Sequence, residues 1–119
     1  MGVTGIGGSL SLARVPAALR DWYIVQLGVC SAPYGEWETE EGTCVFAAFA
    51  ADTDSIAADR RWMLNLRMND LDDLCAPLRA AGITVTTNPE WGMTGGRRFA
   101  STHDPEKNPI ELRQPDPSA

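Results

Sequence analysis

The sequence is poor in the residues from which metal sites and nucleic-acid sites are built. It contains one histidine and three cysteines, and no two cysteines have the C-x-x-C spacing of a zinc or redox site. Its 10 lysines and arginines are outnumbered by 16 aspartates and glutamates, which gives a net charge of −6. Phosphate contacts require clustered basic side chains. We therefore expect no nucleic-acid partner.

Long apolar runs are also lacking. No stretch approaches the ~20 apolar residues that a membrane-spanning helix requires, and the first residues lack the charged start and apolar core of a secretion signal. The cysteines form an odd and widely spaced set, which is typical of reduced thiols. These features predict a cytoplasmic protein without a membrane partner.

The first half of the chain has the pattern of a strand, a helix and a further strand. Small and apolar residues at 5–13 predict the first strand, and Pro16 is placed to open a helix because its missing N–H costs nothing there. Apolar residues at helical spacing continue to Leu27. Gly28 suits the left-handed position just past a helix end, and residues 43–50 predict the next clear strand.

The second half repeats this order. Alternation at 62–69 predicts a strand, Asp70 is placed to cap a helix whose apolar stripe continues to Leu78, and Gly82 ends that helix. Pro77 should kink or shorten the helix, since a proline in a helix interior costs about 3 kcal/mol. Three further strands are predicted at residues 83–89, 97–102 and 109–113.

The two halves superpose after a shift of about 55 positions. With one residue deleted from the second helix, Gly28 falls on Gly82. A repeat of this kind indicates that each unit packs its sheet against the other unit instead of burying it alone. The order of elements therefore predicts an α+β protein made of two similar β-α-β-β-β modules.

Residues 104–112 read DPEKNPIEL, which resembles the DPxGNxxEL hairpin that closes proteins of the vicinal oxygen chelate superfamily, also described as glyoxalase/bleomycin-resistance/extradiol-dioxygenase proteins. Trp91-Gly92 and the stretch 62–72 are also similar, and the resemblance extends over nearly the whole chain. It implies one glyoxalase-like domain over residues 1–119. Its paired βαβββ modules, about 1–55 and about 56–115, would form a half-open mixed sheet around a ligand cleft.

The hairpin motif has the chemistry of a tight turn. Asp104 is placed to accept hydrogen bonds from the main-chain N–H groups that follow it, and Pro105 presets the turn. Lys107 stands where the superfamily has glycine. If the backbone there has a positive φ, a lysine is strained by about 1 kcal/mol.

The resemblance also predicts where a metal would bind in members that use one: near the start of each module and on the last strand of each module. The first two positions fall on Gly8 and Met63, and residues 43–50 contain no carboxylate or histidine, which are the ligands that hard cations prefer. Glu111 alone remains, and His103 lies at a turn where the superfamily has no ligand. We predict a protein without a metal and without another cofactor.

Strand alternation outlines the cleft. If the leucines of 62–69 pack under the second helix, the residues between them face the cleft, and such a mixture of apolar walls and few polar groups is typical of a small-molecule pocket. The predicted ligand-binding residues are Leu10, Leu12, Trp37, Met63, Asn65, Arg67, Trp91 and Arg113, with Glu111 as the candidate catalytic base. The alternative for Arg67 and Glu111 is a mutual ion pair, and for each tryptophan it is simple packing.

The residues leave three functions open. The chain binds a small organic molecule without a metal, as drug-resistance relatives do, or it is a lyase, isomerase or dioxygenase-type enzyme that acts on a small carbonyl or aromatic substrate. The third alternative is an interaction module with a vestigial cleft. Superfamily members commonly pair and edge strands favour pairing, so we expect a homodimer.

Overall fold

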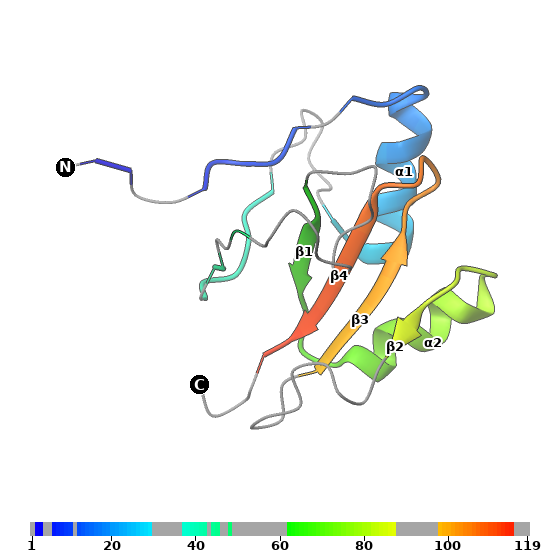
Figure 1. Ribbon diagram of the computed structural model, residues 1–119. Coiled ribbons are helices and arrows are strands. Elements are labelled where there is room, and N and C mark those ends of the chain that lie inside the picture. The colour runs from blue at the N-terminus through cyan, green and yellow to red at the C-terminus, as the bar shows by residue number, and fades with distance from the viewer. Residues whose placement is uncertain are drawn as a thin grey trace.

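The structure, a computed structural model, describes residues 2–3, 6–10, 12–29, 37–42, 44–45, 48, 62–87 and 98–115. Its elements are, in chain order, α1 (Pro16–Leu27), β1 (Leu64–Arg67), α2 (Leu71–Ala80), β2 (Thr86–Thr87), β3 (Arg98–His103) and β4 (Pro109–Gln114). The strands form one open sheet in the order β1-β4-β3-β2, in which only the β1–β4 pair is parallel (Figure 1). The predicted α+β class with a mixed, half-open sheet is confirmed.

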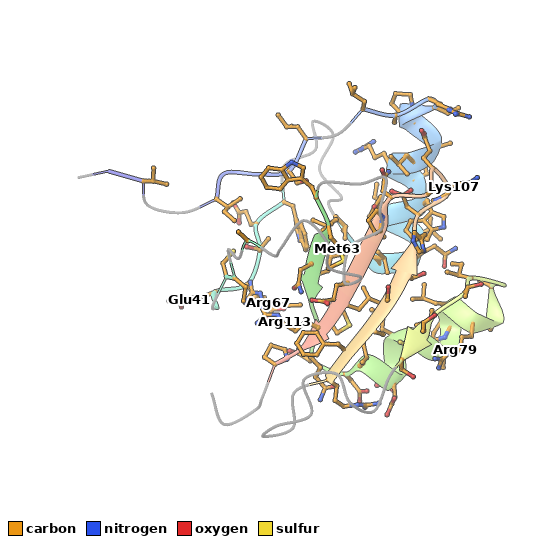
Figure 2. All side chains as sticks on the ribbon, in the orientation of Figure 1. Glu41, Met63, Arg67, Arg79, Lys107 and Arg113 are labelled. Carbon is orange, nitrogen blue, oxygen red and sulfur yellow. The ribbon has the colours of Figure 1, made fainter. Side chains whose placement is uncertain are left out.

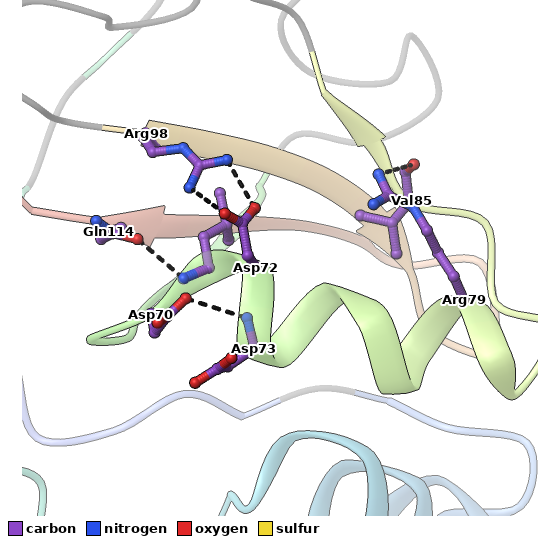
Figure 3. Close-up of polar contacts among 8 residues, drawn as sticks. Asp70, Asp72, Asp73, Arg79, Val85, Arg98 and Gln114 are labelled. Carbon is purple, nitrogen blue, oxygen red and sulfur yellow. Dashed lines mark hydrogen bonds and ion pairs between the residues drawn. The ribbon is translucent and has the colours of Figure 1, made fainter.

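The second half of the chain has the predicted order of elements. Its helix α2 begins after Asp70, whose side chain accepts a hydrogen bond from the Asp73 N–H at 3.1 Å (Figure 3). The chain leaves the helix through Gly82 with a φ of 82°. An early break at Pro77 is wrong, because α2 continues to Ala80. Pro77 lies on the exposed side of the helix, where water can satisfy the carbonyl that its missing N–H leaves unbonded.

Both helices lie on the same side of the sheet (Figure 1). The core is a cluster of residues from α2, β3 and β4, namely Leu71, Cys75, Leu78, Ala100, Ile110 and Leu112. Trp22, Tyr23 and Leu27 of α1 pack against this cluster. The apolar stripes predicted for the two helices therefore cover one face of the sheet, and neither of the described helices lies on its other face.

The helix predicted in the first half of the chain is confirmed. α1 begins at Pro16, and Gly28 ends it in the left-handed conformation at φ 68°. The strand expected at 5–13 is wrong for the residues described there, because 6–10 and 12–13 form no strand. A strand requires a hydrogen-bonded neighbour, and a stretch rich in glycine and serine has few side chains with which to hold one.

The other expected strand of the first module falls mainly outside the described residues. Of 43–50, the structure describes residues 44, 45 and 48, and these three are not in a strand. In the first half of the chain, the structure therefore tests the predicted helix and the described segments on either side of it.

The hairpin between β3 and β4 is closed as its motif predicts. Asp104 is only 4% exposed, and its carboxylate accepts hydrogen bonds from the Glu106 N–H at 2.8 Å and the Asn108 N–H at 3.0 Å. Lys107 has a φ of 69°, so the position that the superfamily gives to glycine does adopt the left-handed conformation. A lysine is strained in that conformation.

The same hairpin also holds α1. The Glu106 carboxylate accepts hydrogen bonds from the N–H groups of Arg14 at 2.6 Å and Val15 at 3.1 Å. The Tyr23 hydroxyl donates to Asp104 Oδ2 at 2.7 Å, and burial together with this hydrogen bond raises the pKa of Tyr23. No side chain at Val15 caps α1, and a turn some 90 residues away instead holds the two residues that lead into the helix.

Candidate functional site

The face of the sheet opposite the helices carries most of the predicted polar site. In the register of β1 and β4, Asn65 lies beside Glu111 and Arg67 lies beside Arg113. Neighbours in register point to the same side of a sheet. Strand β3 adds one residue to each of these rows. We call the following six residues the open face: Asn65, Arg67, Phe99, Ser101, Glu111 and Arg113.

Asn65 joins the two ionisable side chains of β4. Its amide Nδ2 donates to Glu111 Oε1 at 2.5 Å, and its Oδ1 accepts from Arg113 Nε at 3.3 Å. All three side chains are half-buried. One asparagine thus fixes a carboxylate and a guanidinium on neighbouring positions of the face, which is the kind of preorganised polar group that orients a ligand.

The protonation of Glu111 depends on this environment. Burial raises the pKa of the Glu111 carboxyl, and the hydrogen bond from Asn65 and the positive charge of Arg113 act in the opposite direction. Burial has the larger effect, because water is excluded from one side of the carboxylate. A carboxylate with a raised pKa is a better proton acceptor than an exposed one.

Arg67 reaches away from the sheet toward residues 37–42. Its Nη2 donates to the main-chain oxygen of Glu40 at 2.9 Å, and a Cβ added at Gly42 would lie 1.8 Å from its Nη1. The alternative of an Arg67–Glu111 ion pair is wrong, because Glu111 is held by Asn65 and the ion pair found among the described residues joins Arg98 to Asp72.

The other predicted ligand-binding residues are placed as follows. Met63 is half-buried just before β1, and Figure 2 shows it at the opposite end of that strand from Arg67. Leu10 and Leu12 are 100% and 97% exposed, and Trp37 is 47% exposed. Trp91 lies outside the described residues. The structure thus brings together the predicted residues of β1 and β4, and not the leucines of the first module.

Two members of the open face were not predicted from the sequence. Phe99 lies next to Arg113 and Ser101 next to Glu111, both from β3. The signal was available, because strand alternation at 97–102 places these two residues on one side and Ala100 and Thr102 on the other.

Two surface hollows among the described residues lie apart from the open face. One, of about 760 Å³, is formed between the start of α1 and the hairpin and is lined by Leu12, Trp22 and Glu106 among others. A smaller one, of about 330 Å³, lies beside Trp22 and His103. In the first, the Glu106 carboxylate is already bonded to the start of α1, which favours a structural role for this hollow.

The side chains of the open face do not fit a divalent metal. Glu111 is held by an amide N–H and has a guanidinium beside it, and a guanidinium repels a cation. Among the described residues, no three histidine, cysteine, aspartate or glutamate side chains lie close enough together to hold an ion. Neither described helix is long and apolar enough to cross a membrane.

The open mixed sheet with both described helices on one face is an α+β fold (Figure 1). No protein-family model and no curated protein matches the chain. Among solved structures, the chain is similar to the crystal structure of TnmS3, an antibiotic binding protein from Streptomyces sp. CB03234. The two chains are 23% identical, the match covers 97% of this chain and 98% of TnmS3, and the TM-score is 0.58. The two proteins therefore share a fold over nearly their whole length.

Proposed function

We propose that this chain is a glyoxalase/bleomycin-resistance-like protein of the vicinal oxygen chelate superfamily, and that it binds a small organic molecule on its open face without a metal. The observation that carries the proposal is the half-buried Asn65–Glu111–Arg113 network on the side of the sheet away from the two described helices. The fold shared with an antibiotic binding protein supports it, and so does the positive φ of Lys107 in the superfamily's hairpin.

The network offers a ligand complementary groups on a rigid support. Arg113 is a donor and Glu111 an acceptor, and both lie on β4, which has a strand on each side. Met63 and Phe99 supply apolar surface at the two ends of the face. A small molecule with both polar and apolar parts would therefore find its hydrogen-bond partners already in place, which lowers the entropic cost of binding.

The test is calorimetric titration of EDTA-treated protein with bleomycin and with a panel of natural-product antibiotics and small aromatic metabolites, after a thermal-shift screen. We expect at least one compound to bind, and Asn65→Ala to weaken it about tenfold, since the network is lost. Asn69→Ala is the matched control, because Asn69 is exposed just beyond β1. Equal affinity of the two variants, or no binding by any compound, would contradict the proposal.

A second candidate function is catalysis with Glu111 as general base. The observation in its favour is the raised pKa of Glu111. The reaction to examine is exchange of a C–H hydrogen next to a carbonyl, followed by NMR with dihydroxyacetone in D₂O. Exchange that the wild type accelerates and Glu111→Gln does not would support an enzyme. Equal exchange rates with and without protein would remove this candidate.

The proposal extends to domain organisation and assembly. Residues 1–119 form a single domain of two modules, about 1–55 and 56–115, and two chains pair. Apolar side chains near the N-terminus support pairing, because Val3, Leu10 and Leu12 are each at least 95% exposed and exposed apolar patches mark interaction sites. Sedimentation equilibrium should give about twice the 12.9 kDa of one chain. A mass of one chain at micromolar concentration would refute the homodimer.

A further inference from the structure

On the basis of the proposed binding function, we infer that the ligand carries a negatively charged group, which binds between Arg67 and Arg113, and an aromatic ring, which lies on Phe99. These three residues form one row across β1, β4 and β3, because Arg67 is the register partner of Arg113 and Arg113 is the register partner of Phe99. In Figure 2 the two arginines extend from the same end of the sheet.

The two arginines of this row favour the binding of an anionic group. Two like charges directly opposite each other on neighbouring strands are destabilising. The chain has only 10 basic residues against 16 acidic ones, yet it places two arginines side by side. Among the described residues no carboxylate lies within ion-pair distance of Arg67, whose guanidinium bonds a main-chain oxygen instead. Glu111 offsets part of the charge of Arg113, and an anionic ligand group would offset the charge of Arg67.

The chemistry of arginine selects the kind of anion. The planar guanidinium fork matches carboxylate, sulfonate and phosphate oxygens, which it binds in a bidentate manner. Asn65 holds Glu111 in the next row of the sheet, so that this carboxylate is directed to the amide and not to Arg67. The segment 37–42, whose main-chain oxygen at Glu40 accepts the Arg67 hydrogen bond, carries the acidic residues Glu38, Glu40 and Glu41.

Phe99 adds the second element of recognition. It is half-buried and lies beside Arg113. The phenyl ring of Phe99 favours a ligand that is itself aromatic, since two aromatic groups in contact gain about 0.5–1.5 kcal/mol beyond the area that they bury. The ligand class that fits the row is therefore an aromatic acid, with the ring over β3 and the acidic group over the gap between β1 and β4.

Two fluorescent probes separate the charge from the ring. 8-Anilinonaphthalene-1-sulfonate and N-phenyl-1-naphthylamine have the same ring systems, and only the first carries a sulfonate. Fluorescence titrations should show that the wild type binds the sulfonate more tightly, and that Arg67→Gln and Arg113→Gln each weaken it about tenfold, as expected for the loss of a charge-assisted hydrogen bond. The affinity for the neutral probe should change less than about twofold in the same variants.

Three further variants complete the experiment. Arg79→Gln removes an exposed guanidinium on α2, on the other side of the sheet (Figure 2), and should change neither affinity. Arg113→Lys keeps the charge if Arg113→Gln fails to fold, and it should bind the sulfonate more tightly than Arg67→Gln. Phe99→Ala should weaken both probes alike, and circular dichroism establishes that each variant is folded.

The outcomes distinguish this inference from the proposed function. Loss of sulfonate binding in the two open-face arginine variants, with the neutral probe retained, supports it. Equal affinity for both probes that neither arginine changes would overturn the inference and leave the open face as a neutral binding site. Binding of neither probe to the folded wild type would overturn it as well, and so would an effect of Arg79→Gln as large as that of Arg67→Gln.

Discussion

The two faces of the sheet are built from alternating residues of the same strands, and they differ in burial, polarity and hydrogen bonding. On the side of the helices, Ile110 and Leu112 are 0% exposed and pack in the core. On the other side, Glu111 and Arg113 are half-buried and bonded to Asn65. A single strand therefore contributes to stability with every second residue and to the candidate site with the residues between.

This comparison teaches where mutations should act. A residue of the covered face should change the free energy of unfolding and leave the chemistry of the ligand face alone. A substitution on the open face should mainly change the affinity for a ligand and have a smaller effect on the free energy of unfolding. The hairpin that joins β3 to β4 belongs to neither face, and its effects should be on stability, because its polar groups are bonded to each other and to α1.

The largest effect is expected on the covered face. Leu112→Ala should lower the free energy of unfolding by about 2–5 kcal/mol, because it leaves a cavity among residues that cannot fill it. Ser101→Ala on the open face should cost less than about 1 kcal/mol. Urea denaturation of both variants measures the two losses of stability. Similar losses would contradict the predicted difference between the two faces.

The hairpin should come next. Asp104→Ala removes the acceptor of the Tyr23 hydroxyl and of the Glu106 and Asn108 N–H groups. The loss of bonds to a buried charged group should cost about 2–4 kcal/mol. Tyr23→Phe removes one of these bonds and should cost about 1–2 kcal/mol. Equal stability of Asp104→Ala and the wild type in thermal unfolding would show that the hairpin does not hold α1.

A smaller effect of opposite sign is expected at Lys107. Its φ of 69° is one that glycine adopts without a steric cost, so Lys107→Gly should raise the free energy of unfolding by about 0.5–1 kcal/mol after the greater flexibility of the unfolded chain is included. Lys107→Ala, which keeps a Cβ, serves as the control and should give no such gain. Calorimetric melting of the three proteins would decide the question.

The smallest effect is the pH dependence caused by Glu111. Because burial raises its pKa in the folded state, the unfolded chain releases this proton first as the pH rises. The folded state then binds more protons, so the contribution of Glu111 to stability falls as the pH rises through the interval between the two pKa values. Glu111→Gln keeps an oxygen for the Asn65 amide, and its stability in urea titrations should thus gain on that of the wild type as the pH rises above about 4.3, the ordinary pKa of a glutamate. A gain in the opposite direction would contradict the raised pKa.

Local patterns predict the elements of the second half because its strands and α2 pack on one another. Alternation at 62–69 assigns Asn65 to one face of the sheet. The helix cap at Asp70 is also predictable, because its hydrogen-bond donor, the Asp73 N–H, lies only three residues further along the chain. The strand expected at 5–13 could not be judged in this way, since a strand depends on a neighbour that its own sequence does not contain. The Tyr23–Asp104 bond spans 81 residues, and helical spacing alone marks Tyr23 only as part of an apolar stripe.

The site was predictable as a set of residues but not as a network. Strand alternation places Glu111 and Arg113 together, and it also permits an Arg67–Glu111 ion pair. Which partner Glu111 takes depends on the register of β1 against β4, which puts Asn65 beside it. Register is a property of the assembled sheet and not of either strand.

The most direct test of the open face is to observe its side chains by NMR while a probe binds. The Asn65 side-chain amide and the Arg113 Nε–H report on the open face, the Trp22 indole N–H on the hollow beside α1, and the Arg79 Nε–H on α2. In a titration with 8-anilinonaphthalene-1-sulfonate, we predict that the Asn65 and Arg113 signals shift while the Trp22 and Arg79 signals stay. Shifts at Trp22 with Asn65 and Arg113 unchanged would contradict the account.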